Sequence, residues 1–364
     1  MNSNYYCVIM AGGVGARFWP MSTINRPKQF IDIMGDGETL IEKTYKRFLK
    51  ICPAENIYIV TNTSYKKLVT ESIPGIKEDQ IICEPNRRNT APCIAYANYK
   101  IKKINPDAII AVSPSDHIIT DEDLFVDTIN TALSSAENNN WLITLGISPT
   151  RPETGYGYIQ FDETKLSKIN DRSIFKVKVF TEKPAYDMAV TFLRSGDFLW
   201  NAGIFVWSLK SINKAFKLYL PEIDEIFRNG ETAYNTPNEE EFILKAYSIC
   251  RSISIDYGIM EKAENVQVIA CSFGWSDLGT WGSLYENRNK DANNNAISGK
   301  NVLTFDSKNN IINVPEGKLV VVQGLDDYIV AEHDGVLLIC KKQEEQQIRE
   351  FVNNVKLNKG EKYV

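Results

Sequence analysis

Three glycines, an arginine and a lysine follow the first apolar run of the chain, in the stretch AGGVGARFWPMSTINRPKQF at residues 11–30. Closely spaced glycines let backbone N–H groups approach a phosphate, and the side chains of Arg17 and Lys28 are the two cations that hold phosphate oxygens best. Neither common glycine motif fits, because Phe18 stands where a dinucleotide-binding loop needs its third glycine and no Gly-Lys-Ser/Thr follows. The stretch therefore predicts a phosphate-binding loop of another kind.

Two aspartates, Asp116 and Asp277, each follow an apolar run, in VSPSDHII and GWSDLGTW. Two carboxylates from distant loops can share one Mg²⁺, an ion that combines a few carboxylates with phosphate oxygens and water. A turn or helix N-cap aspartate is the competing interpretation, since a helical pattern follows Asp277. The pair is a candidate magnesium site.

A carboxylate and a lysine end a strand-like run in FTEKP, at Glu182 and Lys183. A carboxylate can accept hydrogen bonds from sugar hydroxyls, and a lysine can hold a sugar phosphate. Taken alone, the tripeptide is more typical of a surface ion pair closed by a proline.

The elements that must position these side chains alternate between strand and helix patterns in the first half of the chain. Short apolar, β-rich runs lie at residues 5–11, 56–62, 80–85, 107–113 and 141–147, and helical patterns such as 38–50 and 89–104 lie between them. The alternation predicts βαβ units in a doubly wound, Rossmann-like α/β fold with a mostly parallel sheet. Active sites in such sheets lie at the carboxyl ends of the strands, which are expected near 12–17, 84–90 and 114–117.

The second half of the chain shows two other sequence patterns. Longer strands between about 155 and 208, followed by helices at about 210–249, are expected to cover the open edge of the sheet. Residues 296–364 alternate short strands with turn dipeptides, in a rhythm typical of a small β-helix-like stack, and end in a helix at about 343–356. We therefore divide the sequence into a domain at 1–295 and a small C-terminal β domain at 296–364.

Composition excludes several classes of protein. The net charge of −5 disfavours a nucleic-acid surface, and no run approaches the about 20 apolar residues of a membrane span. Seven scattered cysteines without a CxxC pair, and only two histidines, disfavour a disulfide framework and a histidine-based metal site. No leader pattern opens the chain, so we expect a cytoplasmic protein with reduced thiols.

Several ordered motifs resemble the sugar-nucleotide pyrophosphorylases, and more narrowly their mannose-1-phosphate guanylyltransferase branch. Residues 11–30 match the family signature Gly-Gly-x-Gly-x-Arg, then Pro, then Pro-Lys, and the ending Gln29-Phe30 favours the mannose branch. The further matches are EPNRRNTAPCIAYA (84–97), VSPSDHII (112–119, with Ser115 where alanine is common), TGYGYI (154–159), FTEKP (180–184), WNAGIFVW (200–207) and GWSDLGTW (274–281). Such an ordered set is far more specific than any one motif.

The resemblance implies a nucleotidyltransferase that makes GDP-mannose and pyrophosphate from GTP and mannose 1-phosphate, with Mg²⁺ as cofactor. The sugar phosphate would attack the α-phosphorus in line. Arg17 and Lys28 would stabilise the leaving pyrophosphate, and Lys183 would align the attacking phosphate. The positions implied for the nucleotide are Ala11, Gly12, Gly13, Gly15, Glu84, Pro85, Asn89 and Thr90. Those implied for the sugar are Gly157, Glu182 and Asn201, and those for the metal are Asp116 and Asp277.

Two alternatives stay open. One is the same chemistry with another nucleotide or sugar, such as UTP or dTTP with glucose 1-phosphate. The other is a non-catalytic regulatory homologue that binds a nucleotide sugar, which retention of the charged residues disfavours. A second, isomerase activity is also disfavoured, because the roughly 70 residues after Asn295 are too few and too poor in histidine for the cupin-like domain of longer relatives.

The expected partners are the two substrates, with no nucleic acid and no membrane. A β stack as small as residues 301–340 buries little surface alone, so it should pack on another part of the protein. We expect a homodimer with a contact there, and an intramolecular brace is the alternative.

Overall fold

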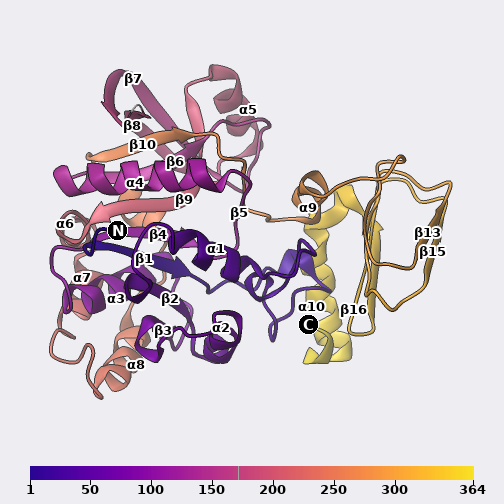
Figure 1. Ribbon diagram of the computed structural model, residues 1–364, viewed down its shortest axis with the longest axis horizontal. Helices are drawn as coiled ribbons and strands as arrows, with labels where there is room; N and C mark the ends of the chain where they lie inside the picture. The colour runs from indigo at the N-terminus through magenta and orange to yellow at the C-terminus, as the bar shows by residue number, and fades with distance from the viewer. Residues whose placement is uncertain (171) are drawn as a thin grey trace. The chain divides into compact units, whose positions relative to one another are not determined.

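The computed structural model describes residues 1–170 and 172–364, which divide into two compact units (Figure 1). The first, here called the sheet unit, comprises Met1–Gly12, Thr44–Ser115 and Ile119–Trp275. The second, here called the loop unit, comprises Gly13–Lys43, Asp116–Ile118 and Ser276–Val364. Each unit is described by itself.

The described residues of the sheet unit place nine strands in one mixed sheet. Their spatial order is β3 (Ile81–Glu84), β2 (Ile57–Asn62), β1 (Tyr5–Met10), β4 (Ile109–Pro114), β9 (Phe198–Ser208), β6 (Leu142–Ile147), β10 (Val266–Cys271), β8 (Arg172–Glu182) and β7 (Gly157–Ile169). The strands β3, β2, β1 and β4 run parallel, as do β6 and β10, whereas β9 pairs antiparallel with both β4 and β6. The α/β fold class is confirmed.

The expectation that the 155–208 region only covers an edge is wrong for β9. This strand lies in the middle of the sheet, and its burial is almost continuous, as in a strand covered on both faces. The long hairpin of β7 and β8 ends the strand order, and the start of β7 also pairs antiparallel with β9.

Helices cover both faces of the sheet. Figure 1 shows α3 and α7 on one side of β1 and β4, and α4 on the other. The side chains of Tyr6 and Val8 share a core with α3, while Cys7 and Ile9 alternate with them and so point to the opposite face. The helices are α1 (Leu40–Phe48), α2 (Lys66–Ser72), α3 (Thr90–Lys102), α4 (Glu122–Asn138), α5 (Tyr186–Ser195), α6 (Leu209–Tyr219), α7 (Pro221–Arg228) and α8 (Glu239–Ile249).

The C-terminal part of the loop unit is built from two stacks of short parallel strands. One stack is β12 (Ala296–Ser298), β14 (Ile311–Asn313) and β16 (Tyr328–His333), with β17 (Val336–Lys341) added antiparallel; the other is β13 (Val302–Phe305) and β15 (Val320–Gln323). Buried amides connect successive turns, since the Asn310 side chain donates to Asn295 Oδ1 at 3.0 Å and accepts from the Tyr328 N–H at 2.9 Å. The expected β-helix-like domain is confirmed.

The same core that supports these strands also holds the stretch that follows the glycines. Phe18 and Trp19 are buried with Trp281 of α9 (Trp281–Asn287), with Ile329 of β16 and with Ile348 of α10 (Ile348–Lys359). Two short strands, β5 (Ile118–Ile119) and β11 (Trp275–Ser276), complete the strands of the described residues. The residues after the glycines therefore depend on the C-terminal part for their packing.

No described helix combines the length and apolarity needed to span a bilayer. All seven cysteines are free thiols, and five of them are buried.

Candidate active site

The glycine loop, residues 11–15, leaves the carboxyl end of β1, as expected for a ligand-binding loop in a parallel sheet. Gly15 lies in the left-handed region at φ +72°, and a Cβ there would lie only 2.5 Å from Lys28 Cβ. Lys28 donates its backbone N–H to the Val14 carbonyl at 3.1 Å, and the Gln29 amide donates to the Gly13 carbonyl at 2.9 Å. The loop therefore needs glycine at position 15 and is braced by the Pro-Lys-Gln stretch.

Lys28 is a buried ammonium with three acceptors. It is 4% exposed, and its Nζ lies 2.7 Å from Asp116 Oδ2 and 2.9 Å from each of the carbonyl oxygens of Asp277 and Leu278. These three bonds use all the donors of the ammonium group. Lys28 thereby holds the Asp116 carboxylate next to the backbone of the Asp277 loop.

The Asp116 carboxyl stays ionised in this setting. Burial by itself raises its pKa, but the charge of Lys28 and the hydrogen bond that Lys28 donates outweigh that effect and lower the pKa below the ordinary value. Asp116 nevertheless keeps 30% of its side chain exposed, so a ligand can reach it.

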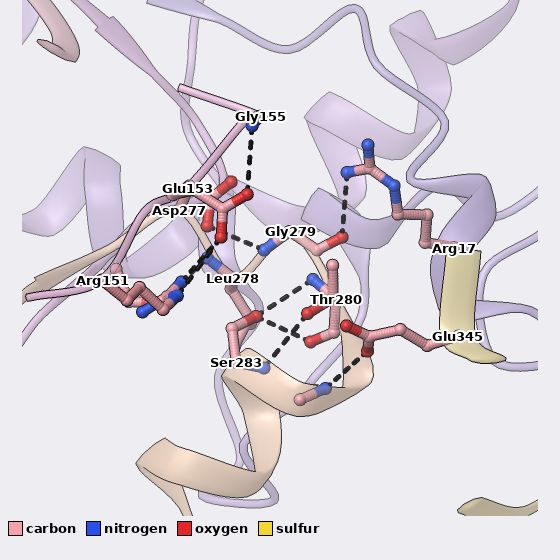
Figure 2. Close-up of polar contacts among 12 residues, drawn as sticks. Arg17, Arg151, Glu153, Gly155, Asp277, Leu278, Gly279, Thr280, Ser283 and Glu345 are labelled. Carbon is pink, nitrogen blue, oxygen red and sulfur yellow. Dashed lines mark hydrogen bonds and ion pairs between the residues drawn. The ribbon is translucent and has the colours of Figure 1, made fainter. Parts of the chain in front are cut away.

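The second aspartate stabilises its own loop. Asp277 Oδ1 accepts the Gly279 N–H at 3.0 Å, and the intervening Leu278 has a left-handed φ of +46° (Figure 2). A Cβ on Gly279 would lie 2.5 Å from Asp277 Oδ2, so a larger residue there would push the Asp277 carboxylate from its position.

Asp116 and Asp277 give a donor set that suits Mg²⁺. Both are carboxylates, the hard oxygen donors that this ion prefers, and one lysine fixes the first beside the backbone of the second. No group of three or more potential metal-ligating side chains occurs among the described residues. Proteins usually bind Mg²⁺ through one or two carboxylates, and phosphate oxygens of the substrate complete the site. Asp116 and Asp277 therefore fit this ion.

Arg17 lies in the short helix Ala16–Phe18 that follows Gly15. Its Nη1 donates to the Gly279 carbonyl at 3.4 Å (Figure 2), and its buried Nε has no partner among the described residues. The guanidinium therefore has donors to offer to an anion.

In the sheet unit, the end of β3 carries a buried carboxyl. Glu84 is 6% exposed and accepts a hydrogen bond from the Tyr247 hydroxyl at 2.8 Å. Burial raises the pKa of Glu84 to about 7, although the Tyr247 bond and the charge of Arg87 act in the opposite direction. A Cβ on Gly12 would lie 3.9 Å from Glu84 Oε2, so Gly12 and Glu84 line the same space.

The neighbouring nucleotide candidates start α3. Asn89 has a left-handed φ of +68°, and its side chain caps the helix by accepting the Thr90 N–H at 2.9 Å. The Thr90 hydroxyl accepts the Ile255 N–H at 2.9 Å, and Pro85 directly follows β3. Ala11 continues β1, because its N–H donates to the Val60 carbonyl at 2.7 Å.

The sugar candidates form a second cluster in the sheet unit. A Cβ on Gly157 would lie 2.5 Å from Glu182 Oε2 and 3.2 Å from Asn201 Cβ, so any larger residue here would displace the Glu182 carboxylate. Glu182 pairs with Lys183, whose φ of +48° is in the left-handed region. The Asn201 amide oxygen accepts from the Thr144 hydroxyl at 2.9 Å.

The sequence interpretation missed Asp256 in this cluster. Its Oδ1 accepts a hydrogen bond from Asn201 Nδ2 at 3.0 Å, and it starts a π-helical turn, Asp256–Met260. Burial and the charge of Glu182 raise the pKa of Asp256 to about 7. Such turns often occur at functional sites, and the only signal for this one in the sequence was an acidic residue in the mixed stretch SISIDYG.

The predicted residues thus fall into three groups. Gly13, Gly15, Arg17, Lys28, Asp116 and Asp277 belong to the loop unit, and the remaining candidates belong to the sheet unit. Within the sheet unit, Gly12 and Glu84 meet at the nucleotide candidates, and Gly157, Glu182 and Asn201 meet at the sugar candidates. Tyr247 and Asp256 are additions that only the structure reveals.

Comparison with known proteins gives consistent matches along the chain. Residues 6–294 match a family described as nucleotidyl transferase, and residues 300–355 match the MannoseP isomerase/GMP-like beta-helix domain. A mannose-1-phosphate guanylyltransferase of Escherichia coli is 32% identical over 98% of this chain and 77% of its own length, and one of Salmonella montevideo is 34% identical over 98% and 75%. A crystal structure from Thermus thermophilus, described as a mannose-1-phosphate geranyltransferase, has a TM-score of 0.86 at 28% identity, with 97% of this chain and 99% of that chain covered.

Proposed function

The chain belongs to the nucleotidyl transferase family, and on this premise we propose that it makes GDP-mannose and pyrophosphate from GTP and mannose 1-phosphate. It is a nucleotidyltransferase; the choice of GTP and mannose 1-phosphate is the proposal. The names of the relatives support that choice, as does the mannose-branch ending Gln29-Phe30. The observation that carries the mechanism is the bonding of Lys28 to Asp116 and to the backbone of 277–278.

The proposed reaction is a direct displacement. A phosphate oxygen of mannose 1-phosphate attacks the α-phosphorus of GTP, the bond to the bridging oxygen of the β-phosphate breaks, and pyrophosphate leaves with the electron pair. The sugar phosphate is already an anion at neutral pH, so no general base is needed. Catalysis then rests on positioning and on neutralisation of charge.

The loop unit supplies the groups for the phosphates. Backbone N–H groups of Gly13 and Gly15 approach the triphosphate, and Arg17 stabilises charge on the leaving pyrophosphate. Lys28 adds positive charge and fixes Asp116 beside the Asp277 loop. These two aspartates would hold Mg²⁺, which when bound supplies further neutralisation of the phosphate oxygens.

The sheet unit supplies the groups for the base and the sugar. Gly12, Glu84, Pro85, Asn89 and Thr90 contact the nucleoside, where an acceptor such as the Glu84 carboxyl suits the donor edge of guanine.

The sheet unit also provides the side chains that bind the sugar phosphate. Gly157, Glu182 and Asn201 contact the hexose, and Lys183, which is 58% exposed, aligns its phosphate. Asp256 joins this group through its hydrogen bond with Asn201.

The test is to mix the protein with Mg²⁺, GTP and mannose 1-phosphate and to measure GDP-mannose and pyrophosphate together. UTP, dTTP and glucose 1-phosphate in the same assay distinguish the alternative substrates. Faster turnover of another pair would replace the proposed substrates, and absence of pyrophosphate release with every pair would favour a regulatory homologue.

The metal assignment has its own test. Asp116→Asn and Asp277→Asn should each abolish most turnover while the circular dichroism spectrum stays that of the wild type. A variant that keeps a near wild-type rate at limiting Mg²⁺ would remove that aspartate from the metal site.

We also propose a homodimer through the C-terminal β domain. Six large apolar side chains in its strands and turns are more than half exposed: Leu303, Phe305, Leu319, Val321, Leu337 and Ile339. Such a patch is unusual on a monomer. Light scattering at micromolar concentration tests the proposal, and a monomeric full-length protein contradicts it. If the double variant Leu303→Lys, Val321→Lys is still a dimer, the interface lies in another part of the protein.

A further inference from the structure

The helix α10 packs against the short helix that carries Arg17. Ile348, the first residue of α10, is buried in the same core as Phe18 and Trp19. The Trp19 indole N–H also donates to the Tyr363 carbonyl at 2.7 Å, so the end of the chain is fixed to the same stretch. The first turn of α10 therefore has a defined position beside the Ala16–Phe18 helix.

Arg349 follows Ile348 and brings a second guanidinium to this place. Its side chain is exposed, and neither Arg349 nor Arg17 forms an ion pair with any residue that the structure describes. Partial desolvation and the positive charge of Arg17 lower the pKa of Arg349, which agrees with the packing of α10 against the helix that carries Arg17. Two neighbouring cations repel each other unless an anion lies between them.

Glu345, in the short helix Lys342–Gln347 that precedes α10, has a hydrogen-bond partner of its own. Glu345 accepts the Gly282 N–H at 2.7 Å, at the start of α9, where a carboxylate stabilises the helix end (Figure 2). Arg17 Nε is buried without a hydrogen-bond partner, and the exposed guanidinium of Arg349 has no ion pair among the described residues, so the two side chains keep hydrogen-bonding capacity for an anion. Two planar guanidinium groups suit a diphosphate, whose adjacent phosphoryl groups each accept a bidentate pair of hydrogen bonds.

We propose that Arg349 and Arg17 together form a clamp for a diphosphate group, the β,γ-phosphates of the nucleotide and the pyrophosphate that leaves. This inference rests on the proposed function for the identity of its ligand. It assigns a substrate-binding residue to the C-terminal part of the chain, which carries none of the sequence motifs of the active site.

The experiment is to titrate the full-length protein with inorganic pyrophosphate by calorimetry, for the wild type and for Arg349→Gln. Loss of one charged pair of hydrogen bonds should weaken pyrophosphate binding by about tenfold or more. Arg349→Lys should restore binding only in part, because lysine keeps the charge but lacks the fork. Lys359→Gln, an exposed cation in the last turn of the same helix, is the matched control and should bind as the wild type does.

Orthophosphate and GTP in separate titrations distinguish the possible sources of the anion. A clamp for a diphosphate predicts that Arg349→Gln weakens pyrophosphate and GTP binding by a similar factor and orthophosphate binding less. Equal affinity of wild type and Arg349→Gln for pyrophosphate overturns the inference, as does equal weakening by Lys359→Gln. Because these titrations need no turnover, the clamp can fail while GDP-mannose synthesis stands, and the reverse.

Discussion

Replacement of Glu84 by glutamine should change how the stability of the protein depends on pH. Burial raises the pKa of Glu84 from 4.5 to about 7 in the folded protein. The folded state therefore binds this proton more tightly than the unfolded state does. The stabilisation is fully present below about pH 4.5 and is lost as the pH rises through about 7.

The size of this effect follows from the shift. A rise from 4.5 to about 7 corresponds to about 3 kcal/mol in the free energy of unfolding. Glutamine resembles the protonated carboxyl and carries no charge at any pH. Glu84→Gln should therefore exceed the wild type in stability by up to about 3 kcal/mol at pH 8 and match it near pH 4.5.

Urea unfolding between pH 4.5 and 8, followed by tryptophan fluorescence, measures this difference. The pKa of Asp256 is also raised to about 7, but Asp256 titrates in both the wild type and Glu84→Gln. The difference in their free energies of unfolding therefore reports on Glu84. Tyr247→Phe is the control: it removes the bond that favours the charged carboxylate, so it should destabilise more at pH 8 than at pH 4.5. A stability difference between wild type and Glu84→Gln that is independent of pH would refute the reasoning.

Three further outcomes are expected. Arg17→Ala should lower kcat by about a hundredfold, roughly 3 kcal/mol, with little change in the KM of the sugar phosphate, and an unchanged rate in steady-state assays would give Arg17 a structural role. Gly157→Ala should raise the KM of the sugar phosphate by about tenfold, because the added Cβ displaces the Glu182 carboxylate, and should leave the KM of the nucleotide unchanged. Equal effects on the two KM values would contradict a local cause. Deletion of residues 296–364 should abolish activity and expose Phe18 and Trp19, which dye binding detects, and an active truncated protein would show that the glycine loop holds its shape alone.

Much of the sheet could be predicted because local patterns determine it. The apolar runs at 56–62 and 141–147 became β2 and β6 with boundaries within one residue, since each is a short β-rich stretch ended by polar residues. The position of β9 could not be predicted. Nothing in the local sequence of a buried strand tells between which neighbours it will insert, and its antiparallel direction depends on the long connection before it.

The candidate site divides in the same way. Gly15 and Lys28 belong to one continuous motif, so their types and spacing could be recognised in the sequence. The structure adds the reason for the glycine, because a Cβ at position 15 would lie 2.5 Å from Lys28 Cβ. Tyr247 and Asp256 come from segments more than fifty residues away from their partners and lie in no recognisable motif. Their closeness to Glu84 and Asn201 results from tertiary packing alone.

The residues around the glycines also show why a motif is not a structural unit. The pattern of the sequence changes near residue 295, yet residues 13–43 and 276–364 belong to the same compact unit. A glycine-rich loop has little apolar surface and much backbone freedom, so its shape must be fixed from outside. Phe18 and Trp19 provide the attachment, because each is buried in a core that also contains side chains of α9, of the C-terminal strands and of α10. The aromatic residue that excludes a dinucleotide-binding loop in the sequence is thus the one that anchors this loop in the fold.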